Sequence, residues 1–255
     1  MHRAFHAAPE LLPDQLLTLS PDESRHIGTT LRLTPGREIG IFNGLGWEGT
    51  AVLEAVERGR PCVARVIQVR QIPEPPFRIT LAQVLPRTTR FDWLLQKATE
   101  LGVHTVAPLL GDHSVARPKE RPSKTERWEQ ILIAACKQSG NNRIPRLAPL
   151  QSVKTFLERL PPNEFTLIAA LQEDALPLWA WIDRFQEQLH ALPSSATLLV
   201  GPEGDFSAAE YALARAAGCR PLALTATVLR SETAAIHAVS ILQYELERRH
   251  AIHAQ

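Results

Sequence analysis

Cysteine is scarce in this sequence. The 255 residues include only three, and Cys62, Cys136 and Cys219 lie far apart, with no CxxC pair and no histidine at zinc-binding spacing nearby. An odd number of distant cysteines does not indicate a disulfide framework. We therefore expect neither disulfide bonds nor a structural zinc site.

Net charge is almost absent as well. The 28 Lys and Arg residues against 27 Asp and Glu give a formal charge of +1, so the whole chain has no strong field that would attract nucleic acid. Arginine nevertheless dominates the basic residues. The planar guanidinium of arginine can bind a phosphate through two hydrogen bonds and stack on a base, which is compatible with an RNA partner. A genomic bias towards arginine codons explains the excess equally well.

Long hydrophobic runs are missing too. The chain has no stretch of about 18 apolar residues, and residues 1–15 contain no apolar core of a secretory signal. We therefore expect a cytoplasmic protein. With 44% hydrophobic and 22% charged residues, the composition is that of an ordinary globular protein, and the length of 255 residues favours two domains.

A proline-rich segment divides the chain into two predicted domains. Before it, short β-like runs such as Glu38–Phe42 and Cys62–Val69 alternate with turn signals, which is typical of a small β-barrel. Residues 72–76 read Ile-Pro-Glu-Pro-Pro, and prolines stop both helices and central strands. We therefore predict a barrel over 1–72 and a second domain over 77–255.

The second domain has an alternating pattern. Apolar runs predict strands, helical spacing of apolar residues predicts helices, and the alternation of the two predicts an α/β fold with a mostly parallel sheet. A helix should follow the first strand, from about Phe91 to Leu101. The predicted strands are 79–85, 105–110, 165–171, 197–200 and 221–225, and the other predicted helices lie near 124–139, 175–190, 207–217 and 232–249.

One turn in this domain indicates a ligand site. An apolar strand at 197–200 runs into Gly201-Pro202-Glu203-Gly204, and Ser207 with Glu210 form a capping box that starts a helix. Ligands bind at the carboxyl ends of strands in such sheets. A purely structural turn explains the glycines and the proline about as well. The dinucleotide and Walker A fingerprints are both absent.

A second cluster of polar residues lies at the start of the last helix. Arg230, Ser231, Glu232 and Thr233 follow the strand predicted at 221–225. Ser231 could simply cap the helix, with Glu232 favoured by the helix dipole. Arg230 is not explained in this way, because a cation at a helix N-terminus opposes the dipole.

Together these motifs resemble a known family. The pair GPEGDFSAAE (201–210) and VLRSETAA (228–235), separated by one predicted strand, is similar to the signature of the RsmE family of ribosomal RNA uridine-N3 methyltransferases in the SPOUT superfamily. The similarity extends to residues 96–103, 138–145, 26–33 and 42–44 and so covers essentially the whole chain. Family members commonly carry Gly where this chain has Asp205.

The resemblance implies an N-terminal PUA-like barrel that binds RNA and a C-terminal α/β domain with a deep trefoil knot. It also implies that three loops surround S-adenosylmethionine, without a metal. The residues that would bind this cofactor are Leu171, Gln172, Val200, Gly201, Pro202, Glu203, Gly204, Leu224, Val228, Leu229, Arg230, Ser231, Thr233 and Ala234. The implied partners are 16S ribosomal RNA, within the small ribosomal subunit, and a second copy of the chain.

The resemblance further suggests roles in catalysis. Uracil N3 must lose a proton before or during attack on the methyl group, so a base and a stabiliser of negative charge are useful. We assign Arg230 to the developing anion, with Glu232 or Glu203 accepting the proton or orienting that arginine. The residues expected to contact RNA are Arg25, His26, Arg32, Gln138, Ser139, Asn142 and Arg143.

Two other functions remain open at this point. A SPOUT enzyme that methylates the ribose 2′-oxygen would share the knot and the cofactor. A non-catalytic RNA-binding assembly factor would use the barrel for binding and the α/β domain as a scaffold. The Arg230–Thr233 cluster argues against the second, because a scaffold has no need of it.

Overall fold

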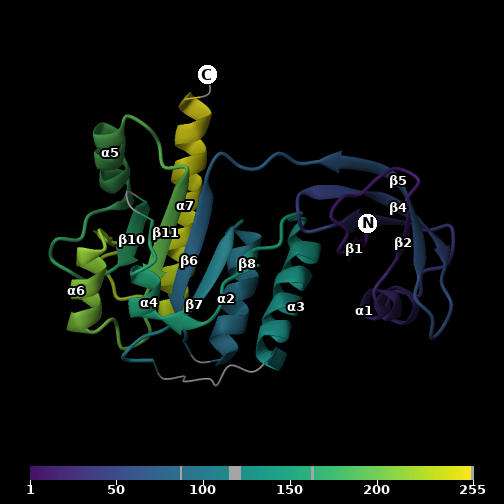
Figure 1. The fold of residues 1–255 in the computed structure, drawn as a ribbon, viewed down its shortest axis with the longest axis horizontal. Helices are drawn as coiled ribbons and strands as arrows, with labels where there is room; N and C mark the ends of the chain where they lie inside the picture. Colours follow the sequence, from purple (N-terminus) through teal and green to yellow (C-terminus); the bar gives the residue numbers. More distant parts are fainter. Residues whose placement is uncertain (87, 115–121, 162–163, 254–255) are drawn as a thin grey trace. The chain divides into compact units, whose positions relative to one another are not determined.

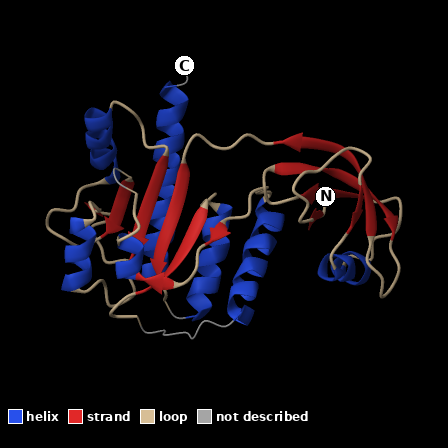
Figure 2. Ribbon diagram, in the orientation of Figure 1, coloured by secondary structure: helices blue, strands red, loops and turns tan. Residues whose placement is uncertain are grey.

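The computed structural model describes residues 1–86, 88–114, 122–161 and 164–253. Its contacts divide the chain into two compact units. The first comprises residues 1–74 and 133–144, and the second comprises residues 75–132 and 145–255. Figure 1 names the elements along the chain, and Figure 2 separates helices from strands.

The first unit is built on a curled sheet of five strands. They are β1 (Arg3–Phe5), β2 (Leu16–Thr18), β3 (Glu38–Phe42), β4 (Trp47–Ala55) and β5 (Val63–Gln71). The order is β1-β3-β4-β5-β2, and every pair is antiparallel except β1 with β3. A short helix α1 (Pro21–Arg25) and a π-helical turn η1 (His26–Thr30) complete the unit. The β-rich N-terminal domain is confirmed.

The turn between β3 and β4 is organised by Asn43. Its side-chain oxygen accepts from the amides of Leu45 and Trp47 at 2.9 and 3.1 Å, and its nitrogen donates to the carbonyls of Ala8 and Pro9. The side chain is only 3% exposed, and these four bonds use its hydrogen-bonding capacity. Asn43 therefore holds both the hairpin turn and the segment that follows β1.

Residues 133–144 pack with the first unit, although a boundary drawn along the chain at the proline-rich segment assigns them to the second. Arg143 carries much of this packing. Its guanidinium donates to the carbonyls of Leu45 at 3.0 Å and Ile72 at 2.7 Å. Lys137 adds an ion pair with the buried Glu23, at 2.7 Å. A linear reading could not find this return of the chain, because it depends on contacts between distant residues.

The second unit contains a parallel sheet, as predicted, with seven strands where five were predicted. They are β6 (Arg78–Val84), β7 (Thr105–Leu110), β8 (Arg146–Leu147), β9 (Gln151–Ser152), β10 (Phe165–Ala169), β11 (Ser195–Val200) and β12 (Arg220–Leu222). The order is β12-β10-β11-β6-β7-β8, with β9 also paired to β7. All pairs are parallel. The deep trefoil knot stays a prediction.

Helices cover both faces of this sheet (Figure 2). One face packs against α2 (Thr88–Glu100) and α7 (Ser231–His253), and the other against α4 (Val153–Leu157) and α6 (Ala208–Ala216). The remaining helices are α3 (Pro122–Ser139), whose residues are divided between the two units, and α5 (Leu178–Leu189). Side chains alternate along a strand, so Ala82 and Val84 face α4 and α6 while Gln83 faces the side of α7.

Two predicted strands are shorter than expected. Residues 170–171 and 223–225 were predicted as the ends of strands, but β10 ends at Ala169 and β12 at Leu222. The chain there forms loops that line a pocket. Apolar and β-branched residues produced the wrong prediction, because a loop facing a cavity has much the same composition as a strand end.

The three cysteines are buried and free. Burial raises the pKa of the Cys136 and Cys219 thiols to about 12, so both stay protonated and do not act as nucleophiles at neutral pH. Among the described residues, no helix is both long and apolar enough to cross a membrane.

Gly46 provides the space that Arg143 occupies, and this generates a stability prediction. Gly46 has φ +98°, and a Cβ there would lie 2.4 Å from Nη2 of Arg143. Gly59 has φ +80° with nothing within 4 Å, so it is a matched control. We expect Gly59→Ala to cost roughly 1–2 kcal/mol from backbone strain. Gly46→Ala should cost about 2 kcal/mol more, because charged hydrogen bonds are also broken.

The measurement is urea unfolding followed by circular dichroism, with Arg143→Ala as a third variant. The double variant Gly46→Ala/Arg143→Ala should lose much less free energy of unfolding than the sum of the losses in the two single variants. Equal destabilisation by Gly46→Ala and Gly59→Ala would show that the hydrogen bonds of the arginine contribute nothing.

Candidate active site

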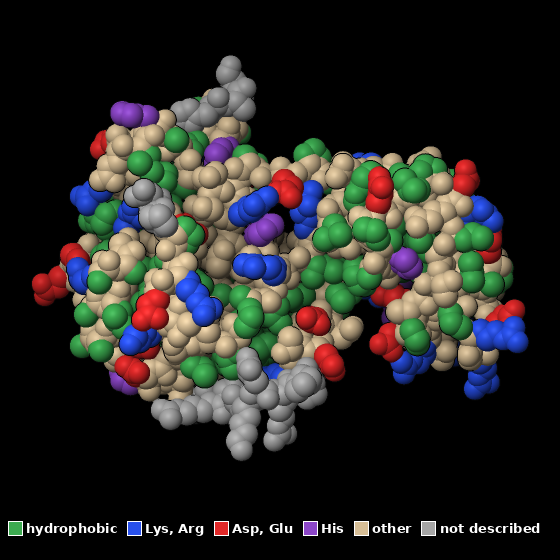
Figure 3. All heavy atoms as spheres, in the orientation of Figure 1, with side chains coloured by type: hydrophobic (Ala, Val, Ile, Leu, Met, Phe, Trp, Pro, Cys, Tyr) green, Lys and Arg blue, Asp and Glu red, His purple; other side chains and the backbone are tan. Residues whose placement is uncertain are grey.

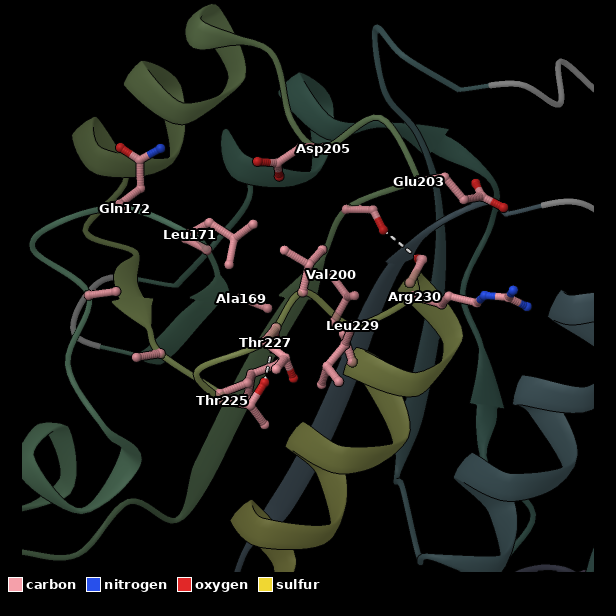
Figure 4. Close-up of a pocket in the computed structure, with 18 of the residues that line it drawn as sticks. Ala169, Leu171, Gln172, Val200, Glu203, Asp205, Thr225, Thr227, Leu229 and Arg230 are labelled. Atoms are coloured by element: carbon pink, nitrogen blue, oxygen red, sulfur yellow. Dashed lines mark hydrogen bonds between the residues drawn. The ribbon is translucent and has the colours of Figure 1, made fainter.

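A pocket of about 520 Å³ lies at the carboxyl ends of β10, β11 and β12 in the second unit (Figure 4). Three loops line it, at residues 169–175, 200–205 and 223–231, and the first residues of α7 complete it. Its size falls within the range of roughly 300–1,000 Å³ typical of small-molecule sites. The location is the sheet edge where ligands bind in α/β folds.

The turn after β11 is anchored by its helix cap. Ser207 accepts from the amide of Glu210, and the Glu210 carboxylate accepts from the amide of Ser207 at 2.9 Å, which confirms the predicted capping box. The other Glu210 oxygen accepts from the amide of Asp112 at 3.0 Å. The cap therefore also connects the turn to the loop after β7.

Gly201 is required by packing inside this turn. A Cβ at Gly201 would lie 3.1 Å from the ring of Phe206, which is buried in the core. If Gly201 were needed for a ligand to approach the backbone, its Cβ position would face the pocket. The nearest atoms to that position belong instead to the Phe206 ring. Gly204 lies outside the pocket lining, and a Cβ there would lie 3.3 Å from Cβ of His113.

Gln83, Ser231 and Gly201 join three elements beneath the pocket. The Ser231 hydroxyl donates to the carbonyl of Gly201 at 2.5 Å, and the Gln83 amide nitrogen donates to Ser231 Oγ at 2.9 Å. Gln83 is fully buried and Ser231 is 5% exposed. Ser231 therefore ties the start of α7 to the β11 turn.

Arg90 on α2 holds two carboxylates beside the pocket. Its Nη1 lies 3.0 Å from Oε1 of Glu203, and its Nε lies 3.5 Å from Oε1 of Glu232. Glu203 lines the pocket, whereas Glu232 does not. The second oxygen of Glu232 is buried and has no hydrogen-bond partner among the described residues. Our hypothesis that these carboxylates orient Arg230 finds no support here, because both pair with Arg90.

Arg230 lines the pocket without pairing to an acid among the described residues. Its side chain is exposed, and Figure 4 shows it extending away from Leu171 and Val200. Its carbonyl accepts from the amide of Ala234 in the first turn of α7. An exposed cation at a helix N-terminus is available to stabilise negative charge on a bound substrate.

A small polar network closes another part of the pocket. Tyr211 donates its hydroxyl to Oδ1 of Asp205 at 2.8 Å, and Gln172 also interacts with that hydroxyl. Burial and the bond to Asp205 raise the pKa of Tyr211 well above its usual value, so it stays a hydrogen-bond donor. Asp205 and Gln172 line the pocket, and Tyr211 lies behind them.

Most residues predicted to bind a cofactor lie in this pocket. They are Leu171, Gln172, Val200, Gly201, Pro202, Glu203, Leu224, Val228, Leu229, Arg230, Ser231 and Ala234. Gly204 and Thr233 do not line it. The lining also contains residues that were not among those predicted to bind the cofactor, namely Ala169, Ala170, Ala175, Asp205, Ala223, Thr225 and Thr227. Gln83 and Arg90 lie behind it.

A signal for Gln83 was present in the sequence. It is a polar residue within the apolar run of β6, and a polar side chain buried in a parallel strand needs a partner. Arg90 offered no such signal. Its two acidic partners, Glu203 and Glu232, lie far along the chain, so no local pattern connects them to it.

The residues expected to contact RNA fall into two groups in the first unit. Arg25 and Arg32 line a groove of about 900 Å³ between α1 and the loop that joins β4 to β5, where Arg58 and Arg60 also lie. In Figure 3, basic side chains gather at the edge of this unit, near the position of α1 in Figure 1. The ring of His26 contacts the ring of His2 in a tilted arrangement, with centroids 5.0 Å apart.

The second group lies at and after the end of α3, and only part of it is accessible. Gln138 and Ser139 are exposed, Asn142 is buried, and the guanidinium of Arg143 donates to backbone carbonyls. The structure thus gives Arg143 a structural role and leaves Gln138 and Ser139 accessible.

Comparison with known proteins identifies the family. A model described as an RNA methyltransferase domain matches residues 73–243, and one described as an RNA methyltransferase PUA domain matches residues 19–64. Ribosomal RNA small subunit methyltransferase E of Bacillus subtilis is 28% identical over 90% of both chains. The chain belongs to the RsmE family of RNA methyltransferases. The resemblance found in the sequence is confirmed.

Solved structures agree with this family. An RsmE protein of Neisseria gonorrhoeae, bound to S-adenosylmethionine, is 28% identical with a TM-score of 0.84, covering 96% of this chain and 97% of that one. A methyltransferase of Legionella pneumophila, also in complex with S-adenosylmethionine, is 32% identical with a TM-score of 0.84, covering 95% and 97%. The RsmE fold therefore extends over both units of this chain.

Ser231 generates a prediction about the stability of the site. Ser231→Ala removes the bond to the Gly201 carbonyl and leaves that acceptor buried, which should cost about 1–3 kcal/mol. Ser240→Ala is the matched control, because Ser240 lies on the same helix with an exposed side chain. Chemical unfolding of both variants measures the difference. A destabilisation no larger than that of Ser240→Ala would mean that the connection contributes nothing.

Proposed function

We propose that this chain methylates N3 of a uridine in 16S ribosomal RNA with S-adenosylmethionine as the methyl donor. One observation carries the proposal: the two segments that resemble the RsmE signature, 201–210 and 228–235, come together around one pocket in a member of that family. A ribosomal RNA substrate would place the enzyme in the cytoplasm, acting on RNA of the small ribosomal subunit.

The pocket suits such a cofactor. Apolar side chains from Leu171, Val200 and Leu229 form walls for a flat ring. Among the described residues, the amides of Val228 and Leu229 donate no backbone hydrogen bond, so they can face the polar edge of an adenine. Mostly apolar walls with a few directed polar groups are typical of cofactor sites. The proposal includes no metal.

When bound, S-adenosylmethionine supplies a methyl group already activated by its sulfonium sulfur. The residues of the chain then need to position the uracil, exclude water and manage charge. Arg230 is suited to the negative charge that develops on the uracil oxygens, because it lines the pocket and no acid among the described residues pairs with it. Glu203 and Glu232, held by Arg90, are the candidates for accepting the N3 proton.

The first unit supports the choice of RNA as substrate. Arg25, Arg32, Arg58 and Arg60 surround one groove, although Arg25 and Arg60 also pair with Asp22 and Glu57. Arg32 and Arg58 are therefore the cations best placed to contact phosphates or unstacked bases. We propose that residues 1–72 act as the RNA-binding domain and residues 77–255 as the methyltransferase domain.

We also propose a homodimer within which the two copies share their active sites. The apolar residues Ala235, Val239, Leu242 and Leu246 of α7 are buried inside the chain and so do not support a dimer. Support comes instead from exposed apolar residues: Tyr244 on the outer side of α7 and Leu171 and Val228 at the pocket. Contiguous exposed apolar patches often mark an interface, and Leu171 and Val228 lie together at the pocket.

Arg230→Ala tests the proposed chemistry. Loss of a charge stabiliser typically lowers the rate of the chemical step by about 10²–10³. We expect such a decrease in single-turnover methyl transfer to small-subunit RNA or assembled subunits, with little change in calorimetric affinity for S-adenosylmethionine. Nucleoside mass spectrometry of the product should identify N3-methyluridine, and a 2′-O-methylated nucleoside would instead support the ribose methyltransferase.

Arg248→Ala is the matched control, because Arg248 lies on α7 outside the pocket and pairs with Glu245. If Arg230→Ala methylates at the wild-type rate, or loses cofactor binding and fold together, the role assigned to Arg230 is wrong. Cofactor binding without any methyl transfer by the wild-type protein, on RNA and on assembled subunits, would favour a non-catalytic RNA-binding factor.

The groove of the first unit generates a prediction about RNA affinity. Arg32→Ala should weaken binding to small-subunit RNA and reduce the dependence of log affinity on log salt by about one unit for each phosphate that Arg32 neutralises. Arg37→Ala is the control, because Arg37 is exposed in the same unit and does not line the groove. Filter binding at several salt concentrations measures both effects. Identical salt slopes for the two variants would remove Arg32 from the RNA interface.

A further inference from the structure

Asp205 is a pocket-lining carboxylate to which the proposed mechanism gives no role. It follows the Gly201–Gly204 turn, and Figure 4 labels it above Leu171 and Val200. Its backbone has φ +61°, in the left-handed region that non-glycine residues rarely adopt. Aspartate tolerates this conformation better than most residues because its short side chain can bond locally.

Local hydrogen bonds fix the position of this carboxylate. Its Oδ1 accepts from the amide of Phe206 at 2.8 Å and from the hydroxyl of Tyr211 at 2.8 Å. Both donors are neutral, so the negative charge is held in place without being cancelled. The side chain of Asp205 is therefore a fixed charge at the pocket wall.

The other charges around the pocket are arranged differently. Glu203, the second pocket-lining acid, is paired with Arg90 at 3.0 Å. Asp205 has no ion pair with a cation among the described residues. Arg230 also lines the pocket, but Figure 4 shows its side chain extending away from Leu171 and Val200. A negative field at the Asp205 side of the pocket is the result.

We propose that Asp205 makes the pocket bind S-adenosylmethionine more tightly than the product S-adenosylhomocysteine, an inference that rests on the proposed function. The two molecules share the adenosine, the ammonium and the carboxylate. They differ in the sulfur, which is a cationic sulfonium in the donor and a neutral thioether in the product. A fixed anion favours the cationic molecule, and it loses that preference once the methyl group has been transferred.

The consequence is easier exchange of product for donor after each turnover. Within a partly buried pocket the attraction is screened less than it would be at the surface. We expect Asp205 to contribute about a threefold to tenfold preference for the donor, since a tenfold change corresponds to about 1.4 kcal/mol.

Asp205→Asn is the test, measured by isothermal titration calorimetry on the full chain. Asparagine keeps an oxygen for Phe206 and Tyr211 and tolerates the same backbone conformation, so only the charge is removed. Asp174→Asn is the control for net charge, because Asp174 is exposed, pairs with Arg215 and does not line the pocket. The ligands are S-adenosylmethionine, S-adenosylhomocysteine and sinefungin, which carries an amine cation in place of the sulfonium.

Asp205→Asn should lower the affinity for S-adenosylmethionine and sinefungin about threefold to tenfold. The affinity for S-adenosylhomocysteine should change by less than about twofold, since only the first two ligands carry the extra cation. Asp174→Asn should leave the affinity for all three ligands unchanged. Equal weakening of all three ligands by Asp205→Asn would overturn the inference, because the carboxylate would then recognise a group that they share. No change for any ligand would overturn it as well. A wild-type protein that bound none of the three would instead refute the proposed function.

Discussion

The hydrogen bond from the Ser231 hydroxyl to the Gly201 carbonyl is the interaction on which the pocket depends. It joins the first residue of α7 to the turn after β11, and Gln83 on β6 donates to the same hydroxyl. These groups are buried, so breaking the bond would leave the Gly201 carbonyl, among the described residues, with only the longer bond from Gln83, at 3.4 Å. The two segments with the family signature are therefore held together by one small group of side chains.

This connection also explains how charge is distributed around the pocket. With α7 fixed against the turn, Glu232 and Glu203 lie close enough to share Arg90, and Arg230 is left exposed at the pocket. Asp205 is held separately by Tyr211 and the amide of Phe206. Among the described residues that line the pocket, Arg230 and Asp205 thus carry charges without an ion pair, whereas Glu203 is paired with Arg90.

The first unit is organised by the same kind of buried polar contact. Asn43 accepts from two amides in the turn between β3 and β4, and Arg143 donates to the carbonyls of Leu45 in that turn and of Ile72 after β5. Gly46 leaves the space that the guanidinium needs. Residues 133–144 therefore belong to the first unit by contact, although residues 75–132 of the second unit precede them in sequence.

The sequence by itself determined the parallel α/β class and the capping box at Ser207 and Glu210, because these depend on local patterns: alternation of apolar runs and helix caps. Most residues of the pocket were implied by the resemblance of two sequence segments to the RsmE family. Only the tertiary structure decided that Arg90 pairs with Glu203 and Glu232, that Arg143 packs into the first unit, and that β10 and β12 end early to form the pocket. Each of these depends on residues far apart in the chain. Their partners are selected by folding, and no local pattern records them.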